Sequence, residues 1–354
     1  MKKMFMAAGM AAVMTACGTA GQKAATDAGN PFLAEYSTPF GVPPFDLIKV
    51  EHYKEAFLKG MEEQKKEIDA IVNQRSVPDF DNTIAAFDQS GELLNKVSTV
   101  FSGLNSCNTN DEMQAFNKEI TPLLSAHRDD ISLNPALFAR VKEVYERREK
   151  LGLDKEQNKL LEETYKKFVR GGANLDSVDQ AKLRQLNSEI SMLQLTFGQN
   201  LLKETNAFEL VIDKKEDLAG LPESLVASAA EAAKGAGMEE KWLFTLHNPS
   251  VMPFLQYADN RELREKIFKG YINRGNNGNE ADNNEIVKKL VALRLEKAKL
   301  MGYADYASFI LEDRMAKNEE NVYRLLNQIW TPAVAKAKEE LSDIQSEIKK
   351  EGAN

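Results

Sequence analysis

"LVALRLEKAKLMGYADYASFILEDRMA" (residues 290–316) is the stretch that decides the fold. It predicts a helix that ends at Gly302 and a second helix after it, because glycine commonly follows the last turn of a helix. Helical patterns of this kind recur through most of the chain, so we expect a mainly α protein. The 354 residues suffice for one large domain or for two to three smaller ones.

The first predicted helix has an apolar face made by Tyr53, Phe57, Met61, Ile68 and Val72. Residues whose side chains cap helix N-termini well mark the starts of further helices. A long helix is expected from Ser177 to about Thr205. The predicted caps are Asp81, Thr109, Asn134 before Pro135, and Asp154.

The apolar period changes from helical to alternating after the long helix. Phe208, Leu210 and Ile212 alternate with polar residues, and "KWLFTLH" (residues 241–247) is a second strand candidate. An alanine-rich helix starting at Pro222 separates them. The sequence therefore predicts a small two-stranded β insertion in a helical body.

Two segments are expected to deviate from regular packing. "TPFGVPPFDLI" (residues 38–48) predicts an extended arm whose Phe40 and Phe45 pack on the body, since prolines exclude a continuous helix. The polar residues 276–285 predict a mobile surface loop.

The last helical pattern carries an apolar stripe, and Pro332 is expected to kink or split the helix. With no later helix to cover it, this stripe predicts self-association or a partly molten last element. The stripe consists of Val322, Leu326, Ile329, Val334, Ala337, Leu341, Ile344 and Ile348.

The N-terminus is typical of a bacterial lipoprotein. Lys2 and Lys3 precede an apolar run that is too short to span a bilayer and ends in "MTAC" at Cys17. We expect residues 1–16 to be a signal peptide, Cys17 to be the lipid anchor, and residues 17–30 to be a flexible tether. By analogy with the sorting of bacterial lipoproteins, we expect the protein on the periplasmic side of the outer membrane. The alternative is an ordinary signal sequence in which Cys17 is a buried thiol.

Composition and motifs exclude several functions. A formal net charge of −8 argues against a nucleic-acid partner, which requires a basic face. The sequence contains no H-E-x-x-H, P-loop, G-x-G-x-x-G or G-x-S-x-G motif.

The residues with metal-binding or nucleophilic side chains are not arranged as a site. His52 is expected to be structural and His127 exposed, while His247 ends the second strand; no two share a helical face. Asp129 and Asp130 are adjacent, so they point apart, and we expect both to be solvated. Cys107 is expected to be an inert, partly buried thiol at a helix end.

Three segments together resemble the thimet oligopeptidase family of zinc metallopeptidases, in its dipeptidyl carboxypeptidase branch. They are "FDLIKVEHYKEAF" (residues 45–57), "LHNPSVMPFLQYADNRELREKIFKGYINRG" (residues 246–275) and the opening stretch. The resemblance extends from about Asn30 to the last residue. It implies a two-lobed, mostly helical fold around a deep channel that admits short unfolded peptides, and a zinc site in the later half of the family pattern.

The resemblance implies that this chain is the N-terminal half of such a peptidase. Residues 31–247 would form a helical N-terminal domain with the β-ribbon, and residues 248–354 would begin the catalytic domain. The missing C-terminal half is the expected packing partner. No zinc ligand or catalytic residue can be assigned to this chain, so we expect it to bind no zinc and to cleave no peptide by itself. The alternative is a non-catalytic helical lipoprotein that binds peptides or a protein partner.

The lipid anchor predicts a modified N-terminus. In the native host, residues 1–16 should be absent and Cys17 should be diacylated with a blocked amine, because two lipid signals give stable membrane association. Mass spectrometry of the native N-terminus measures this. An unmodified Cys17 in a soluble mature protein would contradict the prediction.

Overall fold

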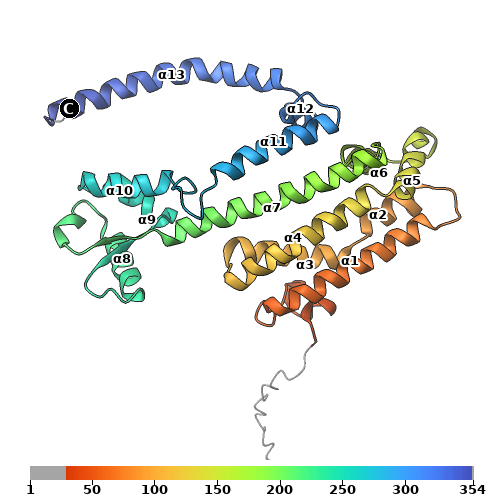
Figure 1. Cartoon of the computed structure of the whole chain (residues 1–354), viewed down its shortest axis with the longest axis horizontal. Helices are drawn as coiled ribbons and strands as arrows, with labels where there is room; N and C mark the ends of the chain where they lie inside the picture. The colour runs from red at the N-terminus through yellow and green to blue at the C-terminus, as the bar shows by residue number, and fades with distance from the viewer. Residues whose placement is uncertain (1–28, 353–354) are drawn as a thin grey trace, which may run out of the picture.

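The computed structural model describes residues 29–352 and shows a mainly α protein (Figure 1). Cys17, the signal peptide and most of the tether lie outside the described residues. The α-helices are α1 (Val50–Val72), α2 (Ala86–Gln89), α3 (Glu92–Cys107), α4 (Asp111–Ser132), α5 (Pro135–Glu146), α6 (Lys155–Arg170), α7 (Ser177–Ala207), α8 (Glu223–Gly235), α9 (Asn248–Tyr257), α10 (Arg261–Ile272), α11 (Asn284–Leu300), α12 (Tyr306–Leu311) and α13 (Glu319–Lys350).

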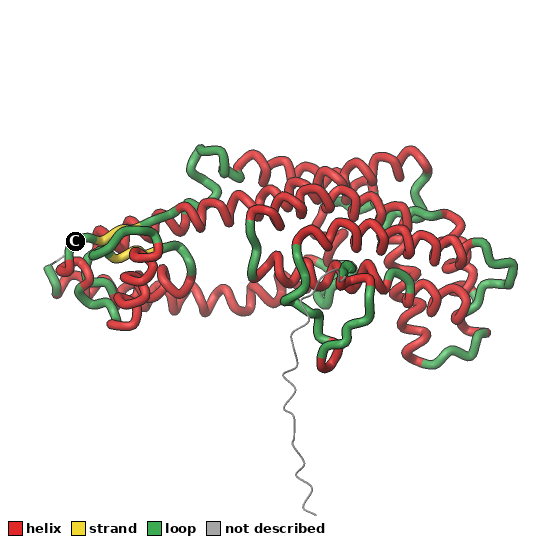
Figure 2. The backbone as a smooth tube through the Cα atoms, turned by 90° about the horizontal axis from the view of Figure 1, so that it is seen from below, coloured by secondary structure: helices red, strands yellow, loops and turns green. Residues whose placement is uncertain are grey.

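Short 3-10 helices add local turns at η1 (Pro31–Leu33), η2 (Pro39–Gly41), η4 (Arg148–Lys150) and η5 (Lys215–Leu218), and η3 (Phe80–Ala85) is a π-helix. Strands β1 (Leu210–Ile212) and β2 (Trp242–Phe244) pair antiparallel with Val211 opposite Leu243. Figure 2 shows this small sheet at one end of an elongated helical molecule. The predicted two-stranded insertion is confirmed.

Helices α1 to α6 form a bundle, and α7 runs from it to the small β-sheet (Figure 1). Apolar residues of α1, α3 and α4 make one core cluster, around Tyr53 and Phe57. Residues of α5 and α6 pack with α1 and η3 in a second cluster around Leu137 and Leu161. A third cluster joins both strands to α8, α9 and α10.

The third cluster spans the expected domain boundary at residue 247. It includes Leu210 and Phe244 from the strands and also Phe254 and Ile267 from α9 and α10, all buried. Phe244 and Phe254 pack edge to face with their ring centroids 4.7 Å apart. The β-ribbon and the first helices after it therefore share one core, whereas the assignment of domains stays a prediction.

The predicted cap at Asn134 is confirmed, because its side chain accepts from the N–H groups of Ala136 and Leu137. Asp154 also caps its helix as predicted. Two other caps are shifted. Asp79 rather than Asp81 caps the next segment, and Asn110 rather than Thr109 caps α4. In both cases the observed cap has the extended backbone that the cap position requires, and asparagine caps better than threonine.

Pro332 does not split the last helix as predicted. Helix α13 has 32 residues and continues on both sides of the proline. Figure 1 shows it as one long arc above α11 and α10. Its N-terminus begins at the cap Asn318, which accepts from the N–H of Asn321. Proline removes one backbone hydrogen bond of the helix. Because α13 is exposed, water can satisfy the carbonyl group that loses its donor.

The expectation that Phe40 and Phe45 pack on the body is wrong. Phe40 is 103% exposed and Phe45 is 50% exposed, and Phe40 has a positive φ of 61°. Phe32 instead inserts into the first core cluster and is 1% exposed, and its ring packs at a tilt against Tyr53 with the two centroids 5.2 Å apart. Lys96 holds the backbone there by donating to the carbonyl of Phe32 at 3.1 Å.

Replacing Phe32 by alanine should destabilise the chain by about 3–5 kcal/mol, because it removes a buried aromatic side chain and leaves a cavity. The matched control is Phe40→Ala, whose exposed ring should change stability by less than about 0.5 kcal/mol. Urea unfolding followed by circular dichroism measures both. Equal effects of the two substitutions would contradict the assignment of Phe32 to the core.

Candidate functional site

The three histidines lie on different elements, and each forms a hydrogen bond with another described residue. In α1, the Nδ1 of His52 accepts from the N–H of Lys49 at 3.1 Å, so its predicted structural role is confirmed. His127 on α4 is half-buried rather than exposed, with Nε2 2.8 Å from Oε1 of Gln64. Helices α1 and α4 pack closely there, which shields its ring. His247 follows β2 as the N-cap residue of α9.

These residues do not fit a zinc site. Across residues 29–352, no three His, Cys, Asp or Glu side chains are grouped so that they could hold a metal ion. Structural and catalytic zinc sites need three or four such ligands converging on one point. No catalytic step through zinc can therefore be derived from the described part of this chain.

Asp129 is buried, so the expectation that it is solvated is wrong. Only 7% of the residue is exposed, and its carboxylate accepts from Nδ2 of Asn187 at 2.8 Å. Lys297 donates to the other end of the same amide, Oδ1 of Asn187, at 2.6 Å. The network joins α4, α7 and α11. Burial raises the pKa of Asp129 and lowers the pKa of Lys297.

Asp130 points elsewhere, as expected for an adjacent helical residue, and forms an ion pair of 2.7 Å with Arg184. Cys107 is exposed rather than partly buried, because it is the last residue of α3, where the helix leaves the bundle. No helix in the described range is both long and apolar enough to cross a membrane.

The loop between α10 and α11 is organised by one carboxylate. Glu204 of α7 is 9% exposed and accepts from the N–H of Gly275, from Asn277 at 2.9 Å and from Asn279 at 2.6 Å. Burial by itself would raise the pKa of Glu204, but these donors together outweigh it and lower the pKa. The polar segment 276–285 is thus a structured loop that packs on α7.

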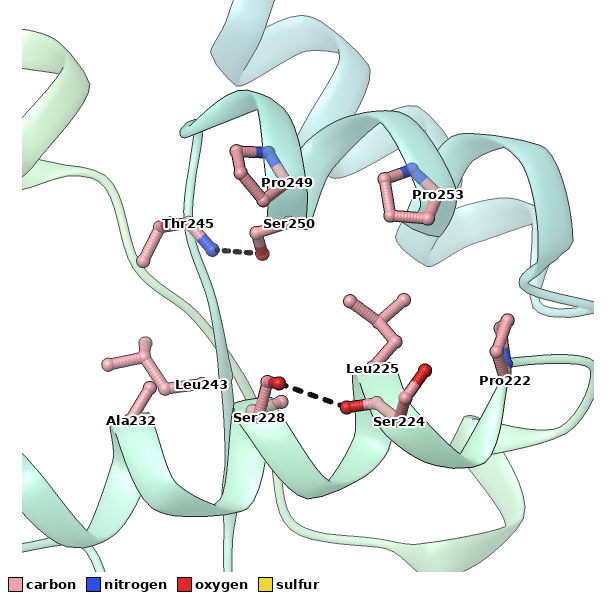
Figure 3. A pocket seen from close by; sticks show the side chains of 11 residues that line it. Pro222, Ser224, Leu225, Ser228, Ala232, Leu243, Thr245, Pro249, Ser250 and Pro253 are labelled. Atoms are coloured by element: carbon pink, nitrogen blue, oxygen red, sulfur yellow. Dashed lines mark hydrogen bonds between the residues drawn. The ribbon is translucent and has the colours of Figure 1, made fainter.

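A first pocket of about 320 Å³ lies between α8 and α9 beside β2 (Figure 3). Ser250 accepts from the N–H of Thr245 at 3.0 Å, and Ser228 donates to the carbonyl of Ser224 at 3.0 Å. Its walls supply hydroxyls and apolar surface but no carboxylate, amine or imidazole. The lining residues are Pro222, Ser224, Leu225, Ser228, Ala229, Ala232, Leu243, Thr245, Pro249, Ser250 and Pro253.

The second candidate is an extended apolar surface on α13, here named the α13 face. None of the 32 residues of α13 is buried. The large apolar side chains of this surface are all at least half exposed, and they include Leu326, Ile329, Leu341 and Ile344 of the predicted stripe. Val322, Val334 and Ile348 of the stripe are partly buried. The α13 face comprises Tyr323, Leu325, Leu326, Ile329, Trp330, Leu341 and Ile344.

The position of the α13 face is set by α12, which α6 holds in place. Arg170 donates to Glu312 at 2.5 Å and to the carbonyl of Phe309 at 2.6 Å, and it lies over the Phe309 ring. Ser308 then donates to Glu319, at the start of α13, at 2.6 Å. The N-terminus of α13 is therefore attached to the bundle through α12, whereas the rest of the helix extends away from α12.

Comparison with known proteins defines the class. Residues 254–354 match the model of peptidase family M3. The chain is 40% identical over 322 residues to dipeptidyl carboxypeptidase of Escherichia coli, a match that covers 91% of this chain and 47% of that protein. The dipeptidyl carboxypeptidase of Salmonella typhimurium is 39% identical over 90% of this chain and 47% of its own length.

Oligopeptidase A of Haemophilus influenzae is more distant, at 29% identity over 88% of this chain and 46% of its own length. The chain thus spans about half the length of the curated relatives it matches. The resemblance to dipeptidyl carboxypeptidases is confirmed: residues 254–354 match peptidase family M3, and the chain aligns with the N-terminal half of these relatives.

Removing the charge of Glu204 should loosen the loop that it holds. Glu204→Gln should lower stability by about 1–3 kcal/mol, because the donors of the loop lose their ionised acceptor. Since the folded-state pKa is lowered, this contribution is present above the ordinary Glu range and is lost as pH falls through the folded pKa. The difference between wild type and Glu204→Gln should therefore shrink in acid.

Urea unfolding at neutral and acidic pH measures this difference. The control is Glu280→Gln in the same loop, where the exposed carboxylate pairs with Lys203 and should contribute little to stability because solvent screens the pair. A Glu204→Gln variant as stable as Glu280→Gln at neutral pH would show that the buried carboxylate does not organise the loop.

Proposed function

We propose that this chain forms the N-terminal part of a zinc peptidase that removes dipeptides from the C-termini of short, unfolded peptides. The 40% identity to a dipeptidyl carboxypeptidase supports this activity over that of a general binding protein. The uncovered α13 face supports a role as part of a larger domain. Zinc ligands would come from the portion of the relatives with which this chain does not align.

The α13 face is the observation that carries the proposal. Leu341 and Ile344 are 63% and 58% exposed, and they lie three residues apart on one side of the helix. The main contact that α13 makes in the fold is with α12 at its N-terminal end. An apolar surface of this extent on a long helix is typical of an interface. Its proposed occupant is the C-terminal half of an M3 peptidase.

Peptide hydrolysis would then require this chain to associate with the C-terminal half of the peptidase. The chain alone would have no hydrolytic activity, and docking of the second half on the α13 face would complete the peptide channel. The proposed periplasmic, lipid-anchored location rests on residues 4–17 and fits a peptidase that acts on short peptides outside the cytoplasm.

Substitution on the α13 face should separate docking from folding. Leu341→Asp should leave the stability of the chain within about 0.5 kcal/mol of wild type, because Leu341 is already solvated. It should weaken association with the second half about tenfold or more, because a leucine that becomes buried contributes about 1.5–3 kcal/mol. Ser342→Asp, one residue along and on another side of α13, is the matched control.

The measurement is hydrolysis of an N-blocked tripeptide after this chain is mixed with the C-terminal half of the E. coli enzyme. The two halves of the E. coli enzyme serve as the positive control. Activity should require both components and should fall with Leu341→Asp but not with Ser342→Asp. Hydrolysis by this chain alone, or no activity in a mixture whose positive control is active, would contradict the proposal.

A further inference from the structure

A second cavity lies inside the helical bundle, away from the α13 face. Its volume is about 490 Å³, within the range of small-molecule sites, which is about 300–1,000 Å³. Five helices contribute to its wall, namely α1, α2, α3, α4 and α6. The lining residues are Gln64, Phe87, Leu94, Ser98, Leu124, His127, Arg128, Ile131, Ser132, Lys167 and Phe168.

The cavity occupies the seam between two core clusters. Leu94 and Leu124 pack on the cluster around Tyr53, whereas Phe87 and Ile131 pack on the cluster of α5 and α6. The wall between them is apolar on both sides, which leaves a hollow where the two halves of the bundle meet. Such a hollow favours an apolar ligand group, because filling it removes apolar surface from water.

The rim of the cavity is cationic. Arg128 and Lys167 are both exposed, and neither forms an ion pair or a side-chain hydrogen bond with any residue in the range 29–352. The lining contains no carboxylate. The two acids beside Arg128 on α4 are engaged elsewhere, Asp129 with Asn187 and Asp130 with Arg184. The rim therefore carries two positively charged side chains that form no ion pair with another described residue.

A fixed polar group lies between the apolar wall and the rim. His127 contacts Oε1 of Gln64 through Nε2 at 2.8 Å, which leaves Nδ1 as the other ring nitrogen. Gln64 itself is held against Gly91, where a Cβ atom would lie 2.4 Å from its Nε2. Burial lowers the pKa of His127 and outweighs the opposing effect of Asp130, so the ring is neutral at pH 7.

We propose that this cavity binds a small molecule with one apolar group and one carboxylate. The apolar group would fill the seam between the core clusters, and the carboxylate would lie between Arg128 and Lys167. Arginine and lysine both bind carboxylates through charge-assisted hydrogen bonds. A second negative charge on the ligand would find no further cationic side chain in the cavity wall, so the cavity favours a ligand with a single negative charge. Two sources share this chemistry, the C-terminal residue of an apolar peptide and a short fatty acid.

The test is a ligand-observed NMR titration of the 354-residue chain with N-acetylphenylalanine and, separately, with octanoate. Whichever source fits should bind saturably, and binding should weaken with added salt because the cations are exposed. N-acetylphenylalanine amide keeps the apolar group and lacks the charge, and it should bind at least about fivefold more weakly than the acid, as expected for loss of a charged hydrogen bond.

Three variants localise the binding. Arg128→Gln and Lys167→Gln should each weaken it about fivefold, whereas Lys338→Gln, which removes an exposed charge on α13, should leave it unchanged. Ser98→Phe should abolish it by filling the cavity from α3. Circular dichroism and urea unfolding report whether each variant folds. If Ser98→Phe does not fold, the affinities of Arg128→Gln and Lys167→Gln test the proposal.

The proposal is overturned if neither carboxylate binds, if the amide binds as tightly as the acid, or if the rim variants behave like Lys338→Gln. It is also overturned if a folded Ser98→Phe variant retains the affinity of wild type. Because the readout is binding to this chain alone, the result is independent of whether the chain takes part in peptide hydrolysis.

Discussion

The hydrogen-bonded bridge through Asn187 is the constraint on which the arrangement of the helices depends. This one amide accepts from Lys297 of α11 and donates to Asp129 of α4, so it fixes both helices against α7. Without Asn187, the buried carboxylate of Asp129 and the half-buried amine of Lys297 would lose the amide that satisfies them. The ion pair between Lys182 and Glu296, at 2.8 Å, reinforces the same contact at the surface. Helix α7 thus connects the bundle to the segment that matches peptidase family M3.

This arrangement ends in a surface that the described residues do not cover. Helix α11 is fixed on α7, α12 is fixed on α6 through Arg170, and α13 leaves α12 with its apolar side chains exposed (Figure 1). In proteins, most of the stability of a helix comes from tertiary packing of its apolar face, and α13 has little of this packing among the described residues. The rigid part of the chain and the surface proposed for docking therefore have very different local stabilities, although both belong to one continuous sequence.

The sequence predicted those features that depend on local pattern. The mainly α fold, the β-ribbon at residues 210–212 and 242–244, and the apolar stripe on the last helix all follow from apolar periodicity. Features set by tertiary contact could not be predicted in this way. Burial of Asp129 depends on Asn187, which lies 58 positions away, and the order of the loop at 276–285 depends on Glu204. Phe40 and Phe32 are both aromatic residues near prolines, and only the packed structure distinguishes the exposed one from the buried one.

The central claim is the proposal that the C-terminal half of an M3 peptidase docks on the α13 face. Amide hydrogen exchange, followed by mass spectrometry on this chain with and without the C-terminal half of the E. coli enzyme, tests it most directly. In the chain alone, residues 319–350 should exchange much faster than α7, which serves as the internal reference. Adding the second half should protect these residues and leave α7 unchanged. Protection of α13 equal to that of α7 in the chain alone, or no gain of protection in the mixture, would contradict the account.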